Sequence, residues 1–239
     1  AGVTANMPVG EPGGPDTEMF YDFDPTLELG LHAKSNWASD PCHPNCDCGR
    51  FMEIGNNVFM VYVRAENGFE FLQNKNIDHG SGLERFVAAA NNDNDVFNID
   101  VFANAIKKLE ELSGKKYFPI QSDTEILGVD KLTQSFRVIA DHLRGATFFI
   151  ADGIYPGNKD QGYFVRRLMR RAIRHGRNLG ITENFCKIIA TEYINYHGDV
   201  YKELVENKNK VLEVIDEEED KFKKTLERAI KVLNYTFNV

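Results

Sequence analysis

The sequence has 239 residues, of which 42% are hydrophobic and 27% are charged, and its net charge is −8 at pH 7. The composition is ordinary for a globular protein, and the length is sufficient for a sizeable buried core. The net charge excludes a protein that is basic throughout and wraps nucleic acid, but it permits a local basic surface. Because no apolar run reaches about 18 residues, we expect no membrane span and no membrane partner.

The N-terminus, AGVTANMPVGE, lacks the basic and apolar regions of a signal peptide and does not begin with Met. We therefore expect an internal piece of a longer protein. The chain has four cysteines, Cys42, Cys46, Cys48 and Cys186, too few for a disulfide framework at this length. This usage favours a reducing, cytoplasmic location.

The first third of the sequence predicts strands. Residues 17–23 and 51–64 are rich in aromatic and β-branched side chains, which favour a pleated sheet. The second of these runs leads through Asn67-Gly68 into residues 69–73, which predicts a hairpin with a positive φ at the turn. A turn-rich insertion at 35–50 separates the two predicted strands.

From Gly82 onward the hydrophobic spacing becomes helical. Gly114 is placed to cap one predicted helix at its C-terminus. The last forty residues predict one long amphipathic helix or two close ones. The other predicted helices cover 82–91, 101–116, 131–153, 162–180 and 183–198.

The predicted fold class is therefore α+β, with an antiparallel sheet followed by an all-helical part. We expect one domain over 1–115 and a helical domain over 116–239, with the change in pattern falling between residues 100 and 125.

The stretch NIDHGSGLERF, residues 76–86, places two glycines and charged side chains where a strand gives way to a helix. Gly80 and Gly82 let another molecule approach the backbone closely. The helix N-terminus and Arg85 suit phosphate, whereas Asp78 suits an amine. The alternative interpretation is a simple strand–helix turn with charged residues on the surface.

The pattern G-x-G-x-E-R at 80–85 resembles motif 3 of class II aminoacyl-tRNA synthetases, which here covers residues 77–90. Six blocks in this order are similar to consecutive segments of the alanyl-tRNA synthetase family: GPDTEMFYD, EIGNNVFM, IDHGSGLER, RVIADHLRGATFFIADG, GYFVRRLMRRAIRHG and KFKKTLERA.

The resemblance implies ATP-dependent ligation of alanine to tRNA(Ala) through an alanyl-adenylate, with Mg²⁺ accompanying ATP. No side chain is implied as a catalytic acid, base or nucleophile, because positioning and charge stabilisation carry the reaction. Gly55 and Asn57 depart from the family pattern, which has a large aromatic and an apolar residue there. The implied alanine-binding residues are Asn56, Val58, Asp78 and Gly80, and the implied ATP-binding residues are Glu53, Gly82 and Arg85.

In this family, motifs 1 and 2 precede the GPDTEMFYD block, near which this sequence begins. We therefore expect the chain alone to form little alanyl-adenylate. Two other functions stay open at this point. One is a non-catalytic module that binds the tRNA acceptor stem, and the other is a class II synthetase-like enzyme with different amino-acid specificity.

The segment GYFVRRLMRRAIRHGR predicts a helix with one basic face. At about 100° per residue, its six arginines from Arg166 to Arg177 fall within a sector of about 140°, opposite the apolar residues. This face predicts RNA contact, and the alternative is a salt-bridged surface facing the acidic run 213–220. The resemblance implies that an Asn and an Arg here read the G·U pair of the acceptor stem; Asp160 occupies the Asn position. The predicted tRNA-binding residues are Asn158, Asp160, Arg166, Arg167, Arg170, Arg171 and Arg174.

The segment DPCHPNCDCGR has three thiols and a histidine within a few residues, a spacing compatible with a small Zn²⁺ site. The predicted ligands are Cys42, His43, Cys46 and Cys48, and His32 is an alternative ligand. The other interpretation is a loop with reduced thiols.

Overall fold

The computed structural model describes residues 7–118 and 129–237, which form two compact units that divide between Ile99 and Asp100. The predicted domain boundary at residues 115 and 116 lies inside the second unit. Part of the predicted transition region, 119–125, lies outside the described residues. The functional division at residue 115 stays a prediction.

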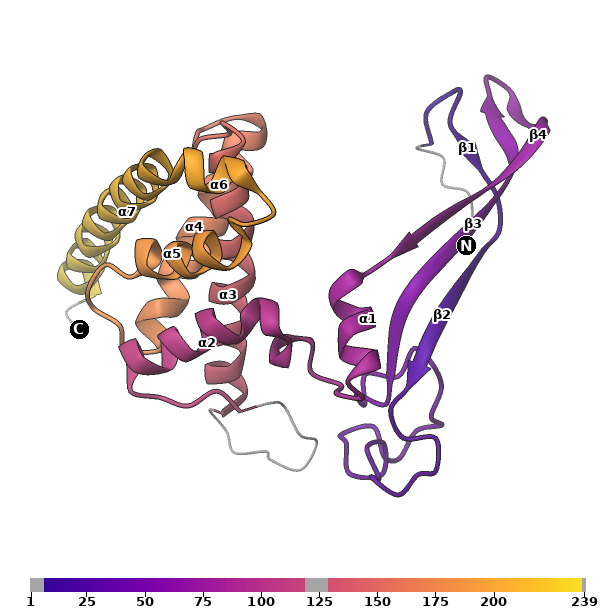
Figure 1. Cartoon of the computed structure of the whole chain (residues 1–239), viewed down its shortest axis with the longest axis horizontal. Helices are drawn as coiled ribbons and strands as arrows, with labels where there is room; N and C mark the ends of the chain where they lie inside the picture. The colour runs from indigo at the N-terminus through magenta and orange to yellow at the C-terminus, as the bar shows by residue number, and fades with distance from the viewer. Residues whose placement is uncertain (1–6, 119–128, 238–239) are drawn as a thin grey trace. The chain divides into compact units, whose positions relative to one another are not determined.

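The first unit is built on an antiparallel sheet of four strands (Figure 1). The long strand β3 is central: β4 pairs with one edge, and β1 and β2 pair with successive parts of the other. Ala65 pairs with Gly68 at the hairpin turn, where Gly68, and not Asn67, adopts the positive φ of 142°. The strands are β1 (Pro12–Gly13), β2 (Asp16–Asp22), β3 (Phe51–Ala65) and β4 (Gly68–Ser81).

A short helix follows the sheet. Helix α1 (Leu83–Ala90) begins directly after β4 and contacts β3, and its Ala88 and Ala89 are buried. A single 3₁₀ turn, η1 (Val96–Asn98), follows, with the Asp95 carboxylate accepting from the backbone N–H of Phe97.

Residues 23–50 join β2 to β3 without any helix or strand, and we name this segment the cysteine loop. At its start, the Asp24 carboxylate accepts from the backbone N–H groups of Leu29 and Leu31. At its end, Arg50 forms a two-pronged ion pair with Asp22, at 2.6 and 2.9 Å. This ion pair ties the two ends of the loop together.

The second unit is helical, which confirms the α+β class. Helix α3 contacts each of the other helices of this unit (Figure 1). The final segment forms two helices, α6 and α7, one of the two arrangements expected. In the described ranges, no helix is long and apolar enough to span a membrane. The helices are α2 (Asp100–Ser113), α3 (Val129–Ala151), α4 (Asp160–Asn178), α5 (Cys186–His197), α6 (Lys202–Glu206) and α7 (Lys208–Phe237).

The core of this unit follows from the spacing of apolar residues along α3. Phe136, Ile139, Leu143 and Ile150 recur at intervals of three, four and seven and are almost fully buried. Fully buried side chains of α4 and α5 also enter this core. Among them, the Tyr193 hydroxyl donates to the Ala140 carbonyl at 2.9 Å, which satisfies its polar end.

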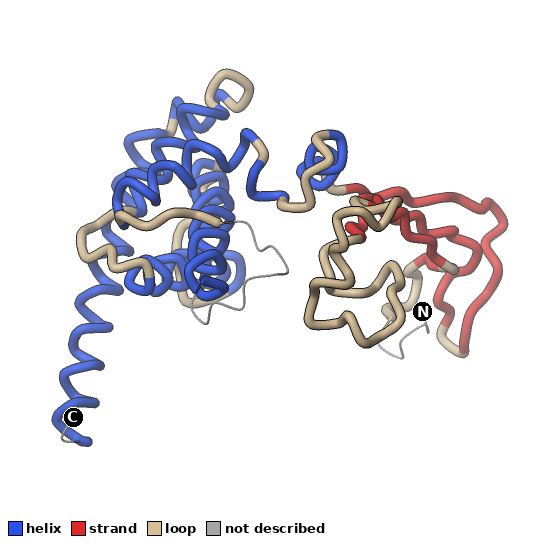
Figure 2. Tube along the Cα trace, turned by 90° about the horizontal axis from the view of Figure 1, so that it is seen from below, coloured by secondary structure: helices blue, strands red, loops and turns tan. Residues whose placement is uncertain are grey.

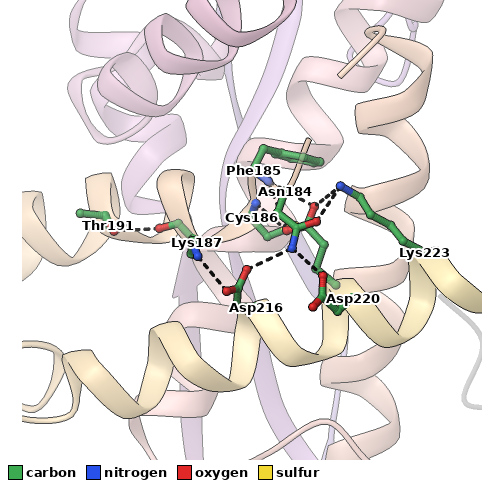
Figure 3. Close-up of polar contacts among 9 residues, drawn as sticks. Asn184, Phe185, Cys186, Lys187, Thr191, Asp216, Asp220 and Lys223 are labelled. Atoms are coloured by element: carbon green, nitrogen blue, oxygen red, sulfur yellow. Dashed lines mark hydrogen bonds and ion pairs between the residues drawn. The ribbon is translucent and has the colours of Figure 1, made fainter. Parts of the chain in front are cut away.

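Helix α7 is fastened to the start of α5 by polar contacts (Figure 3). Asp216 accepts from Lys187 at 2.7 Å, and both Asp216 and Asp220 accept from the Asn184 amide. The far end of α7 extends beyond the other helices of the unit (Figure 2), and Tyr235 there is 88% exposed.

Candidate functional site

The predicted alanine-binding residues share one face of the sheet. In the register of β3 and β4, Asn56 pairs with Gly80 and Val58 pairs with Asp78. Residues directly opposite each other on antiparallel strands point to the same face, and so do residues two apart in one strand. The structure therefore brings these four residues into one row.

This face is open around Asp78 and Gly80, both of which are exposed. Among the residues that the structure describes, none forms a hydrogen bond or ion pair with the Asp78 carboxylate. No described atom lies within 4 Å of the point where a Cβ on Gly80 would stand. A small ligand can therefore approach both the carboxylate and the backbone.

The opposite face of the same strands carries a second polar row that the sequence reasoning missed. The His79 Nδ1 and the Asn57 Oδ1 are 2.8 Å apart, and the Asn57 amide reaches Thr17 Oγ1 at 3.5 Å. In the same row, Met19 Cε lies 2.7 Å from the position a Cβ on Gly55 would take. Successive residues of a strand point to opposite faces, so Gly55 and Asn57 of EIGNNV lie on the face opposite Asn56 and Val58. This alternation could have predicted the second row from the sequence.

Arg85 and Glu53 meet where β4 passes into α1. The Arg85 Nη1 donates to the Glu53 carbonyl at 2.9 Å and to its carboxylate at 3.3 Å. A Cβ on Gly82 would stand 3.2–3.4 Å from the aliphatic carbons of Arg85. A glycine at this position therefore avoids a close contact with the Arg85 side chain. The arginine is half exposed, and it keeps donors available for a ligand.

The basic face predicted on α4 is present. Val165, Met169, Ala172 and Ile173 are fully buried, as the helical spacing predicted. Arg167, Arg171 and Arg174 are exposed and form no ion pair with any described residue. A groove of about 480 Å³ lies along this face, lined by Tyr163, Arg166, Arg167, Arg170, Arg171, Arg174 and Phe222.

The acidic run does not neutralise this face. Within the described part of the run 213–220, only Glu218 forms an ion pair with an arginine of this face, accepting from Arg170 Nε at 2.8 Å. Arg170 also lies over the Phe222 ring, with the guanidinium carbon 5.1 Å from the centroid. The neighbouring Glu219 is fully buried and turns toward α5 instead.

The two remaining predicted tRNA-binding residues lie at the start of α4: Asn158 precedes the helix and Asp160 is its first residue. The Asn158 side-chain oxygen accepts from Arg166 Nη1. Asp160 opens α4 with φ of 49°, a left-handed conformation that Asp and Asn tolerate better than most residues. A Cβ on Gly162 would stand 2.6 Å from the Tyr155 carbonyl oxygen, so this close turn requires glycine.

The cysteine cluster is partly different from its prediction. Cys46 and Cys48 are buried, but His43 is exposed and belongs to no cluster of possible ligands among the described residues. Instead, His32, Cys42 and Cys48 place ligating atoms within 4.8 Å of one another. His43 begins a turn in which its carbonyl oxygen accepts from the Cys46 N–H, and its side chain is exposed there. Burial raises the pKa of the Cys48 thiol to about 11.

Residues 5–238 match the family model of class II (A) tRNA synthetases. The chain is also 42% identical over 221 residues to the alanine–tRNA ligase of Thermotoga maritima. It belongs to the alanyl-tRNA synthetase family. The alanine–tRNA ligases of Clostridioides difficile and Methylococcus capsulatus are 36% and 38% identical to it, each over 224 residues.

These alignments cover 92–93% of this chain but only 23–24% of each alanine–tRNA ligase. The chain thus spans about a quarter of the length of these relatives. The match to the alanyl-tRNA synthetase family confirms the resemblance seen in the six sequence blocks, and it extends over both units of the structure.

Proposed function

We propose that this chain forms part of an alanine–tRNA ligase, in which one face of its sheet takes alanine and ATP and helix α4 takes the tRNA acceptor stem. The observation that carries this proposal is the single row of Asn56, Val58, Asp78 and Gly80, with Arg85 following on the same strand–helix connection.

The spacing of this row fits the two substrates. Asp78 and Gly82 are four strand residues apart, or about 13 Å along the chain. The Asp78 carboxylate receives the ammonium group of alanine, and Gly80 leaves room for the small amino acid. Arg85 then lies further along, where the phosphates of ATP extend.

The Glu53–Arg85 pair prepares the phosphate end of the site. Glu53 orients the guanidinium through both its carbonyl and its carboxylate. The other carboxylate oxygen of Glu53 has no partner among the described residues and can serve the Mg²⁺ that accompanies ATP. In this scheme the chain binds and orients the reactants, and electrostatic stabilisation lowers the barrier.

The register of the sheet bears on whether the site takes alanine or a larger amino acid. Gly55 and Asn57, the two departures from the family pattern, lie on the face opposite Asn56 and Val58. Met19 fills the space in front of Gly55. These departures therefore leave the alanine-facing row unchanged, which supports alanine over a larger amino acid.

The alanine site is tested with a non-hydrolysable alanyl-adenylate analogue, measured by calorimetry. We expect Asp78→Asn to weaken binding by about 10- to 100-fold, because a charge-assisted hydrogen bond contributes about 1.5–3 kcal/mol. Glu70→Gln removes the same charge from another exposed site on β4 and should leave affinity unchanged. Equal affinities for wild type and Asp78→Asn would contradict the assignment.

For the acceptor stem, the support is the concentration of unpaired guanidinium groups beside two aromatic rings. The arginines of α4 can neutralise phosphates, while Tyr163 and Phe222 add aromatic rings to the lining of the groove. Because the face is local, the acidic net charge of the chain does not oppose it.

The RNA site is tested with an acceptor-stem minihelix of tRNA(Ala) by fluorescence anisotropy. We expect Arg167→Ala with Arg171→Ala to weaken binding at about 0.1 M salt by at least about tenfold and to flatten the salt dependence by one to two phosphate contacts. The control, Arg228→Ala with Lys231→Ala, removes two charges from exposed positions of α7. If both pairs weaken binding equally, α4 is not the RNA surface.

A further inference from the structure

We propose that His32, Cys42, Cys46 and Cys48 bind one Zn²⁺ ion, which holds the cysteine loop against the start of β3. The inference goes beyond the ligase function, because it concerns the stability of a loop and stands whether or not the sheet binds alanine. Of the two histidines that the sequence offered as nitrogen ligands, it selects the alternative, His32, in place of His43.

The distances suit a tetrahedral ion. With Zn–S of about 2.3 Å and Zn–N of about 2.0 Å, two tetrahedral ligands N and S lie about 3.6 Å apart. The His32 Nδ1 and the Cys46 Sγ are 3.6 Å apart. The ligating atoms of His32, Cys42 and Cys48 all lie within 4.8 Å of one another, a range that includes the separation of about 3.8 Å expected between two zinc-bound sulfurs.

The histidine is already oriented as a ligand. His32 Nε2 lies 2.9 Å from the carbonyl oxygen of Asp40. A carbonyl oxygen can only accept, so Nε2 carries the proton and Nδ1 directs its lone pair toward the thiols. Zinc-bound histidines commonly use this arrangement, in which a second hydrogen bond fixes the ring and its tautomer.

The charges also fit. Three thiolates and one neutral imidazole around Zn²⁺ leave a net charge of −1. Arg50 Nη1 lies 3.9 Å from Cys42 Sγ, and Arg50 is itself held by Asp22. This guanidinium offsets the residual negative charge of the thiolates.

Polar contacts hold the ends of the cysteine loop, but the loop has little buried apolar surface to order its middle. Apart from Phe23 and Asp24 beside β2, the only buried residues in the cysteine loop are Cys46 and Cys48. Three of its large apolar residues, Leu27, Leu29 and Trp37, are 60%, 53% and 39% exposed. A segment of this length without helix, strand or apolar core is uncommon in a compact domain, and a structural metal supplies what burial does not.

The metal content of the purified chain tests the proposal. The chain is loaded with Zn²⁺ and passed through gel filtration in chelator-free, reducing buffer. We then expect one zinc per chain by inductively coupled plasma mass spectrometry. Co²⁺ in place of zinc should give the intense visible absorption of tetrahedral thiolate coordination. Less than about 0.2 equivalents of zinc, or weak octahedral cobalt absorption, would overturn the proposal.

The two histidines provide a matched pair of variants. We expect His32→Ala to lower zinc affinity by at least about 100-fold. Loss of a residue that only hydrogen-bonds to a ligand costs up to about 100-fold, and loss of a direct ligand should cost at least as much. His43→Ala should bind zinc like the wild type. Cys48→Ser should also lose the metal. Equal zinc binding by the His32 and His43 variants, or a disulfide between any two of the three cysteines under reducing conditions, would refute the site.

Limited proteolysis gives a readout that does not depend on ligase activity. Chelation should expose the cysteine loop to cleavage and leave the helical unit intact as an internal reference. A cleavage pattern that chelation does not change would count against a role for the metal in holding the loop. Binding of the adenylate analogue reports separately on the proposed ligase function.

Discussion

At the scale of single residues, Asp160 is the side chain whose chemistry differs most from its expected role in recognising RNA. A carboxylate accepts a hydrogen bond from the guanine amino group but cannot donate one, and its charge repels phosphate. The backbone at Asp160 is left-handed, with φ of 49°, a conformation that Asn also adopts readily. An amide can therefore replace the carboxylate without strain.

We predict that Asp160→Asn binds a minihelix with the G·U pair several-fold more tightly than the wild type does, and with unchanged thermal stability. The comparison is Asp152→Asn, which removes an equal charge from an exposed site just after α3. If the two variants gain affinity equally, charge alone explains the effect. A gain limited to Asp160→Asn that disappears when G·U becomes G·C assigns base readout to this position.

At the scale of helices and strands, the joint between α5 and α7 is the feature that the sequence concealed. The acidic run 216–220 reads as a solvated helix face, yet Glu219 is fully buried and accepts from the backbone N–H groups of Phe185 and Cys186. It thus satisfies the first N–H groups of α5, and Lys223 Nζ lies 3.2 Å from its Oε1.

We predict that Glu219→Ala lowers the free energy of unfolding of the helical unit by about 3 kcal/mol or more, because it leaves the buried N–H groups of Phe185 and Cys186 without their acceptor and removes the negative charge that faces Lys223. Glu217→Ala is the matched change: it lies on the same helix and removes an exposed ion pair with Lys221. Its effect should be below about 1 kcal/mol. Urea unfolding followed by far-ultraviolet circular dichroism measures both, and equal losses would contradict a capping role for Glu219.

The elements themselves followed closely from local patterns. The predicted strands 17–23 and 51–64 correspond to β2 and β3, and the arginine spacing predicted the buried side of α4 because helical period alone decides it. Local patterns do not decide between partners that are distant in sequence. The sequence named both His43 and His32 as possible ligands, and the choice between them depends on how the cysteine loop folds back. The burial of Glu219 depends on where α7 meets α5.

At the scale of the whole molecule, two units of different construction share one chain. The helical unit has a continuous apolar core across α3, α4, α5 and α7. The sheet unit buries few apolar residues, and Phe71 and Ile77 of β4 are 86% and 56% exposed. We infer that conditions which unfold one unit need not unfold the other, so each stability measurement requires a probe specific to its unit.

One such condition is mild acid, which acts on the helical unit through His175. This side chain is 4% exposed and lies 2.9 Å from the Ser135 hydroxyl. Burial, aided by Arg174, Arg171 and His142, lowers the pKa of His175 below its ordinary value near 6.5. As the pH falls, His175 therefore binds a proton more readily in the unfolded chain than in the folded chain. The helical unit then loses, below about pH 6.5, stability that it has at pH 7.5.

We predict that His175→Gln reduces this decline in melting temperature between pH 7.5 and 5.5, whereas the same change at the exposed His43 leaves the decline as in wild type. A decline of equal slope in both variants would assign the acid sensitivity to other groups.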